Sequence, residues 1–208
     1  ESAAASATTE DALLYSIELV NFAGTESASA LPSRFPLHEQ AFWTTVQKNE
    51  ELQAAASGRS TRHIELALPD GGSYAPGDHL GVFPENPAAL VNAIAERCGA
   101  RLTDVVILRP NSEAGTSSEA LPCGIPISVF DLLTYHIDLA GPVSRRELRA
   151  LARRCPCPPE RIPLEALCSD AAFRSEVYEG KLSLVDLLTR WKSIECDLAL
   201  LLSLRPLL

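Results

Sequence analysis

Three basic side chains have the chemistry to bind an anionic group: His79, Arg62 and Lys181. His79 precedes Gly81 at the start of a predicted strand, where an imidazole can offer a flat donor and acceptor to a bound ring or phosphate. Arg62 carries a fixed guanidinium fork that suits phosphate oxygens. Lys181 places a compact cation directly after Gly180, at a predicted helix end. The three residues indicate anion or ring binding.

Each of these residues also has a structural alternative. His79 can be a turn histidine that bonds to the backbone. Arg62 can be an exposed arginine at the end of a strand, and Lys181 can complement the negative C-terminal end of a helix. The residue types alone leave these alternatives open.

Motifs for catalysis and for metal binding are absent from the sequence. It holds no Gly-x-Ser-x-Gly, no His-Glu-x-x-His, no phosphate-binding Gly loop and no Gly-x-Gly-x-x-Gly. The four histidines lack metal-ligand spacing, and Cys155 and Cys157 stand too close together for the usual zinc knuckle. We therefore expect no catalytic residue and no metal site, and we expect the six cysteines to be reduced thiols of a cytoplasmic protein.

The composition is that of a globular protein with an acidic balance. The chain has 208 residues, 46% of them hydrophobic, and 18 Lys and Arg against 27 Asp and Glu give a formal net charge of -9. This charge argues against nucleic acid as a partner. No apolar run approaches the roughly 20 residues that span a bilayer. The first residue, Glu1, and the lack of any Met favour an internal piece of a longer chain.

Period-2 alternation predicts strands in the first part of the chain. Residues 62–68 alternate apolar and polar, which predicts one buried face, and turns at 70–72 and 76–78 predict an antiparallel partner around 80–82. Further strands are expected within 13–22 and 41–52. These strands together predict a small antiparallel sheet.

Helical signals follow Pro84. Asn86 is expected to cap a helix that Gly99 ends, with Pro87 at its first position. Capping-box spacing at 128–131, 144–147 and 183–186 predicts three more helix starts, and Asp170 opens a helix that Gly180 closes. A sheet followed by helices predicts an α+β fold and not alternating parallel βαβ units.

Several of these segments, taken in order, resemble the diflavin reductase family. They are 59–66 (RSTRHIEL), 74–86 (YAPGDHLGVFPEN), 142–150 (PVSRRELRA), 157–159 (CPP) and 164–167 (LEAL). The resemblance covers roughly 41–206 and is strongest for NADPH:cytochrome P-450 reductase, especially the reductase half of self-sufficient fatty-acid mono-oxygenase fusions. An ordered series of this length is more specific than any single motif.

The resemblance implies a fold and a domain order. We expect a partial antiparallel FAD-binding β-barrel of the ferredoxin-reductase type with an all-helical connecting subdomain. The expected segments are a linker with one possible strand over 1–40, the first barrel strands over 41–85, a helical connecting domain over 86–203, and the start of the next barrel strand over 204–208. In the family, an Arg-Pro pair like Arg205-Pro206 leads into an Arg-x-Tyr-Ser strand that holds the flavin. Because the given chain ends before that strand, we expect it alone to be inactive with NADPH and colourless.

The resemblance also implies a function and site residues. The parent would pass electrons from NADPH through FAD and FMN to a haem mono-oxygenase, with an FMN flavodoxin-like domain as partner. His79 would lie close to the FAD, Arg62 near the NADPH phosphates, and Lys181 would face the FAD pyrophosphate, where several relatives use Arg. A cluster of arginines over 145–154 is either a solvated face or a docking surface for an acidic flavodoxin-like module. The alternative function is a non-catalytic spacer module that keeps the fold and binds no cofactor.

Overall fold

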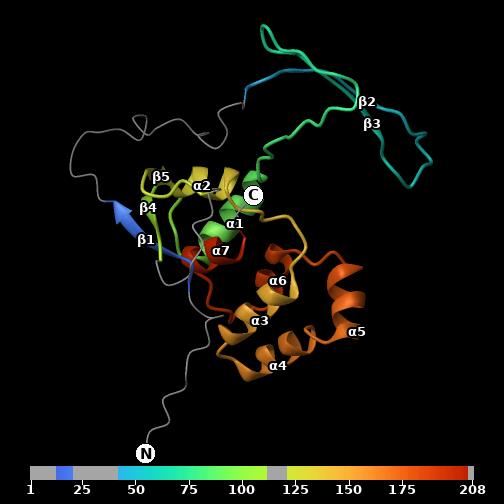
Figure 1. Ribbon diagram of the computed structural model, residues 1–208. Coiled ribbons are helices and arrows are strands. Elements are labelled where there is room, and N and C mark those ends of the chain that lie inside the picture. Colours follow the sequence, from blue (N-terminus) through green and yellow to red (C-terminus); the bar gives the residue numbers. More distant parts are fainter. Residues whose placement is uncertain (1–12, 21–41, 112–120, 206–208) are drawn as a thin grey trace, which may run out of the picture. The chain divides into compact units, whose positions relative to one another are not determined.

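The computed structural model describes residues 13–20, 42–111 and 121–205, and these form two compact units (Figure 1). The larger unit comprises Glu1–Leu37 and Phe83–Leu208, and the smaller comprises His38–Val82. Both units mix irregular segments with regular elements, and the fold class is α+β, as the sequence predicts.

The larger unit contains a three-stranded antiparallel sheet. Its strands are β1 (Tyr15–Val20), β4 (Val105–Pro110) and β5 (Pro126–Ser128), in the order β1-β4-β5. The strand predicted within 13–22 is therefore confirmed. The prediction that 86–203 is all-helical is wrong, because β4 and β5 lie within this range. A short apolar run such as 105–108 cannot be told from a buried helical segment by its periodicity.

Seven α-helices and one π-helix are present in the described part of the larger unit. They are α1 (Ala88–Arg97), α2 (Val129–Tyr135), α3 (Arg145–Arg153), α4 (Pro158–Ala166), α5 (Asp170–Ala172) with the π-helix η4 (Phe173–Tyr178), α6 (Leu184–Arg190) and α7 (Leu198–Leu204). Helix α7 packs on β1, and α1 contacts both α2 and α6 (Figure 1). One hydrophobic core therefore runs from the sheet into the helices, and it includes Tyr15 of β1 and Leu132 of α2.

Local capping signals define most helix starts as predicted. Both halves of the capping box are present at Ser144 and Ser183, and the Ser128 side chain accepts the Asp131 amide. Gly99 follows α1 with a φ of 63°, as expected for a helix stop. The sequence analysis misplaced the cap of α1, which is described next.

Asn86 does not cap α1. Pro87 occupies the N-cap position and no side chain caps the helix. The Asn86 amide instead donates to the carbonyls of Leu133 (2.8 Å) and Ile137 (2.5 Å) at the end of α2. The amide thereby satisfies one carbonyl in the last turn of α2 and one just beyond the helix, which a purely local capping rule does not consider.

The smaller unit is an antiparallel hairpin of β2 (Val46–Glu51) and β3 (Arg62–Leu66). The strands expected at 41–52 and 62–68 are present in shorter form. The predicted pairing of 62–68 with 80–82 is wrong, because β3 pairs with β2 and residues 80–82 form no strand. The turn prediction is confirmed by the positive φ angles of Gly71 (77°) and Gly77 (97°).

Apolar side chains of the smaller unit are exposed. Trp43 is 77% exposed and Ile64 54% exposed, so the prediction that one face of residues 62–68 is buried is wrong. The alternation is real, but in the described part of this unit no second layer packs on the hairpin, and no closed barrel forms among the described strands. Two strands alone bury too little apolar surface to hide a face.

The loop between α6 and α7 is attached to two helices. The Arg97 guanidinium at the end of α1 donates to the carbonyls of Lys192 (2.8 Å) and Ile194. The Glu160 carboxylate of α4 accepts from the Ser193 hydroxyl (2.7 Å) and amide (2.9 Å). These bonds from the Ser193 side chain and backbone lower the pKa of Glu160.

Core and hairpin residues should differ in their effect on stability. Leu132→Ala removes a side chain that is 0% exposed, and we expect it to lower the free energy of unfolding by about 2–5 kcal/mol. The exposed Ile64→Ala should change it by less than about 0.5 kcal/mol. Urea unfolding followed through buried Trp191 measures both. Equal losses in the two variants would contradict the division between a packed core and an open hairpin.

Stability should depend on the Glu160 carboxylate in a pH-dependent way. Because hydrogen bonds lower its pKa in the folded state, its contribution is present above the unfolded pKa and disappears as the pH falls through the folded pKa. We expect Glu160→Gln to lower Tm at pH ~7 and the difference to vanish towards pH ~3. Glu165→Gln on the same helix, which lacks the Ser193 bonds, is the control. A Tm difference independent of pH would contradict this assignment.

Candidate cofactor-binding site

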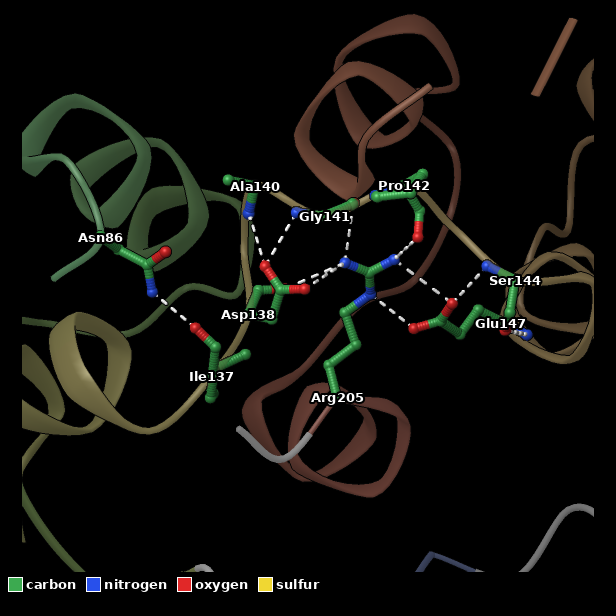
Figure 2. Close-up of polar contacts among 9 residues, drawn as sticks. All are labelled: Asn86, Ile137, Asp138, Ala140, Gly141, Pro142, Ser144, Glu147 and Arg205. Carbon is green, nitrogen blue, oxygen red and sulfur yellow. Dashed lines mark hydrogen bonds and ion pairs between the residues drawn. The ribbon is translucent and has the colours of Figure 1, made fainter. Parts of the chain in front are cut away.

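The Arg205 side chain at the end of α7 is buried and uses all of its hydrogen-bond donors (Figure 2). Nε and Nη2 donate to the two carboxylate oxygens of Glu147, at 2.5 and 3.3 Å. Nη1 donates to the carbonyls of Asp138 (3.0 Å) and Gly141 (2.8 Å), and Nη2 to the carbonyl of Pro142 (2.6 Å). The five N–H groups of a guanidinium thus meet five acceptors. We call these residues the Arg205 cluster.

The acceptors of the cluster are themselves fixed. Glu147 accepts the Ser144 amide at 2.5 Å and so completes the capping box of α3. The Asp138 carboxylate accepts the amides of Ala140 (3.2 Å) and Gly141 (2.8 Å) and lies 3.7 Å from Arg205 Nη1. A Cβ at Gly141 would collide with this carboxylate. A larger residue there would require the Asp138 side chain to move away from the amides whose bonds it accepts, and the turn presents its carbonyls to the guanidinium.

The segment that the Arg205 side chain binds lies beside the residues that follow Lys181 in the chain. The Val143 amide donates to the Leu182 carbonyl at 3.0 Å, and Pro142 forms an isolated bridge with Ser183. Lys181 directly precedes Leu182, and we call this position the Lys181 corner. The segment that the Arg205 side chain binds is therefore joined by two backbone contacts to the residues that follow Lys181.

Lys181 has a left-handed backbone, with φ = 50°. The preceding π-helix η4 ends there: Leu182 N–H donates to the Val177 carbonyl at 3.0 Å and Lys181 N–H to the Tyr178 carbonyl at 3.3 Å. Gly180 was predicted to close this helix, but the left-handed position falls on Lys181 instead. A side chain in this region costs about 1–2 kcal/mol relative to right-handed backbone. The lysine is exposed, and it makes no ion pair within the part of the chain that the structure describes.

His79 lies in the smaller unit, just after the turn that Gly77 and Asp78 make. The Asp78 carboxylate accepts the Ala75 amide at 2.7 Å, and Asp78 N–H donates to the Ala75 carbonyl at 3.0 Å. His79 is exposed, and it makes no hydrogen bond with residues in the described ranges. The bond to backbone considered as an alternative is therefore not formed there.

Arg62 begins β3 in the same unit and forms an ion pair with Glu51 across the hairpin. Nε lies 3.4 Å from Glu51 Oε2, and the side chain is about half exposed. This geometry matches the alternative of an exposed strand-end arginine. His79 and Arg62 share the smaller unit, whereas Lys181 belongs to the larger one, so the three residues do not lie within one compact unit.

The arginines over 145–154 are partly engaged within the chain. Arg145 forms an ion pair with Asp170 and its guanidinium lies 4.7 Å from the centre of the Phe173 ring. Arg154 lies 3.8 Å from Asp197. Arg146 is exposed on α3. The cluster is therefore in part a set of intramolecular contacts.

The sequence analysis missed the Arg205 cluster. Arg205 was noted only as part of an Arg-Pro pair, and Glu147 only as a capping residue. The sequence did contain a signal for it. Arg205 directly follows the apolar run LALLLSL of α7, so its side chain must either point to solvent or find hydrogen-bond acceptors in the core. The backbone carbonyls that accept its hydrogen bonds cannot be recognised from the residue types.

Other kinds of site find no support in the described ranges. No group of three or more His, Cys, Asp or Glu residues there is arranged to hold a metal ion. None of the described helices is long and apolar enough to cross a membrane.

The fold and the site define an α+β module in which Lys181 is an exposed cation with a left-handed backbone and with no ion pair to any described residue. The chain belongs to the FAD binding domain family, whose pattern matches residues 35–208. This membership confirms the resemblance to the FAD-binding region of diflavin reductases, to which the relatives below also point.

Three relatives illustrate this similarity. Bifunctional cytochrome P-450/NADPH–P-450 reductase 1 of Bacillus subtilis (strain 168) is 40% identical over 159 residues, which are 76% of this chain and 14% of that protein. Reductase 2 of the same organism is 41% identical over 172 residues, 80% of this chain and 16% of that protein. NADPH–cytochrome P-450 reductase of Dictyostelium discoideum is 33% identical over 168 residues, 79% of this chain and 25% of that protein. The chain thus spans a small fraction of these relatives.

Removal of the Arg205 guanidinium should destabilise the larger unit strongly. Arg205→Met leaves Glu147 buried without its cation, and we expect a loss of about 3–5 kcal/mol in the free energy of unfolding. The double variant Arg205→Met/Glu147→Gln should recover part of this loss, because the remaining amide is neutral and still offers an oxygen to Ser144. Urea unfolding of the single and double variants measures both effects. Strictly additive losses would contradict the coupling of the two side chains.

Proposed function

We propose that this chain supplies part of the FAD site and the connecting region of an NADPH-dependent diflavin reductase. In this proposal the parent protein passes electrons from NADPH through FAD and FMN to a haem mono-oxygenase. The observation that carries the proposal is the position of Lys181. Its side chain is exposed, its backbone has a φ of 50°, and the next residue bonds to the segment that Arg205 holds. The named relatives, which include fused cytochrome P-450 reductases, support it.

The residues present fit the anionic part of FAD. FAD supplies the redox chemistry when bound, and the protein binds and orients it. Lys181 would hold the pyrophosphate through its charge, and its exposure leaves the ammonium available. His79 is similarly exposed and would offer a ring donor or acceptor to the cofactor. Arg62 would lie near the NADPH phosphates, a role that requires it to release Glu51.

The exposed apolar residues of the smaller unit support the barrel part of the proposal. Trp43, Ile64, Leu80 and Val82 are all more than half exposed. We propose that β2 and β3 are strands of a flavin-binding barrel and that further strands cover these side chains. The segment boundaries at 40, 85 and 203, and the connecting role of the helices, remain predictions.

The proposed partners follow from charge. Arg146 on α3 is exposed and has no ion pair among the described residues, so it can contact an acidic FMN flavodoxin-like module. Such contacts steer transient electron-transfer encounters more than they add affinity. A cytoplasmic location, expected from the cysteine usage, also remains a prediction.

A chimaera tests the proposed function. The matched segment of the Bacillus subtilis reductase 1 is replaced by the corresponding residues of this chain, with which it shares 40% identity. We expect the purified chimaera to retain FAD and to reduce cytochrome c with NADPH. A folded chimaera that holds FMN but no FAD would contradict the proposal and favour the spacer module.

Substitutions of Lys181 in this chimaera separate binding from stability. Loss of one charge-assisted hydrogen bond, about 1.5–3 kcal/mol, should weaken FAD binding about 10- to 100-fold in Lys181→Ala, whereas Lys181→Arg should retain it. Lys181→Gly should lose the same affinity but gain about 0.5–1 kcal/mol in stability, because glycine relieves the left-handed backbone.

The control is Lys192→Ala, which removes another exposed lysine of the same unit. FAD affinity comes from titration of the stripped protein, and stability from urea unfolding. If Lys181 only complements the helix end, all Lys181 variants will bind FAD like the parent, and that outcome would remove the residue from the site.

A further inference from the structure

Two cysteines far apart in the sequence lie side by side in the larger unit. Cys98 Sγ donates to Cys196 Sγ at 4.0 Å, and the two residues are 98 positions apart. Cys98 is partly exposed, whereas Cys196 is buried. No other pair of cysteine sulfurs is in contact among the described residues: the Cys155 thiol, for example, contacts the Ser193 hydroxyl and the Cys157 carbonyl.

The backbone around this pair is held in place. Cys98 is the C-cap residue of α1, and its amide donates to the Ile94 carbonyl at 2.9 Å. Cys196 immediately precedes Asp197, whose carboxylate caps α7 by accepting the Leu200 amide at 2.8 Å. Arg97, next to Cys98, donates to the loop that leads to Cys196. The two thiols are therefore pre-positioned by the ends of two helices.

The surroundings of the pair keep Cys98 protonated. Its hydrogen bond to Cys196, burial and the neighbouring Asp197 carboxylate raise the pKa of the Cys98 thiol, and the Arg97 guanidinium opposes them only partly. Since the thiolate is the reactive form, the dithiol is stable at neutral pH and reacts slowly.

We propose that Cys98 and Cys196 form a dithiol modification site that low-molecular-weight disulfides oxidise to a reversible intramolecular disulfide. The more exposed Cys98 attacks the external disulfide, forms a mixed disulfide and releases one small thiol. Cys196 then attacks the Cys98 sulfur, the S–S bond between the two residues forms, and the second small thiol leaves. Two protein thiols are oxidised, one external disulfide is reduced to two thiols, and these carry the two protons.

The bond would close a covalent loop around residues 99–195. This loop contains α2 to α6 and the Lys181 corner, and the bond ties the end of α1 to the start of α7. Loops of this length lose much of their unfolded-state freedom when cross-linked. Oxidation requires the two sulfur atoms to approach from 4.0 Å to about 2.05 Å, and the closed loop should then stabilise the larger unit.

The test uses the full 208-residue chain with oxidised glutathione as the probe. We expect a mass decrease of two hydrogens, a cross-linked peptide pair that contains Cys98 and Cys196, and a rise in Tm of several degrees that dithiothreitol reverses. The reaction should accelerate at alkaline pH. Cys98→Ser and Cys196→Ser should each abolish the cross-link, and the control Cys157→Ser should keep it.

Peptide mapping of the unaltered chain decides the result even if a serine variant fails to fold. A disulfide that joins other cysteines would overturn the proposal. So would a chain that carries only mixed disulfides with glutathione, because a thiol at the position of Cys196 would displace the small thiol from Cys98.

Discussion

A buried guanidinium is the constraint on which the larger unit depends. Arg205 directly follows the apolar helix α7, and its side chain is buried. A buried cation is stable only if a negative charge lies beside it and every N–H group has an acceptor. Glu147 supplies the charge and the turn at Asp138, Gly141 and Pro142 supplies the carbonyls. The end of α7, the start of α3 and the turn between α2 and α3 are thus fixed by one side chain. A shift in any of them would leave a buried polar group without its partner.

Local chemistry explains the parts of the fold that could be predicted. The capping boxes at Ser144 and Ser183 and the stop at Gly99 each depend on a few neighbouring residues, and the sequence shows them directly. The failures concern which strands pair. Strand β3 pairs with the preceding strand β2 and not with the following segment 80–82, and β1 pairs with β4 across about ninety residues. Alternation indicates that a strand exists, but not which strand lies beside it.

The candidate site also has parts that could be predicted from the sequence and parts that could not. His79 and Lys181 were found through resemblance to a family, because a single basic residue in a loop has no local signature of its own. The connection between Lys181 and Arg205 could not be predicted, since it runs through main-chain bonds at Val143 and Leu182 that any residue type can make. The structure adds that the residues directly after Lys181 bond to the segment that the Arg205 side chain holds.

The π-helix η4 has a consequence for how the chain can vary. Its wider turn, in which the Glu179 amide reaches back to the Arg174 carbonyl, accommodates one residue more than an α-helical turn would. Loss of a single residue from Phe173–Tyr178 would remove this extra residue and favour ordinary helical winding. Residue count in this one turn, as much as residue identity, therefore shapes the helix end that leads to Lys181.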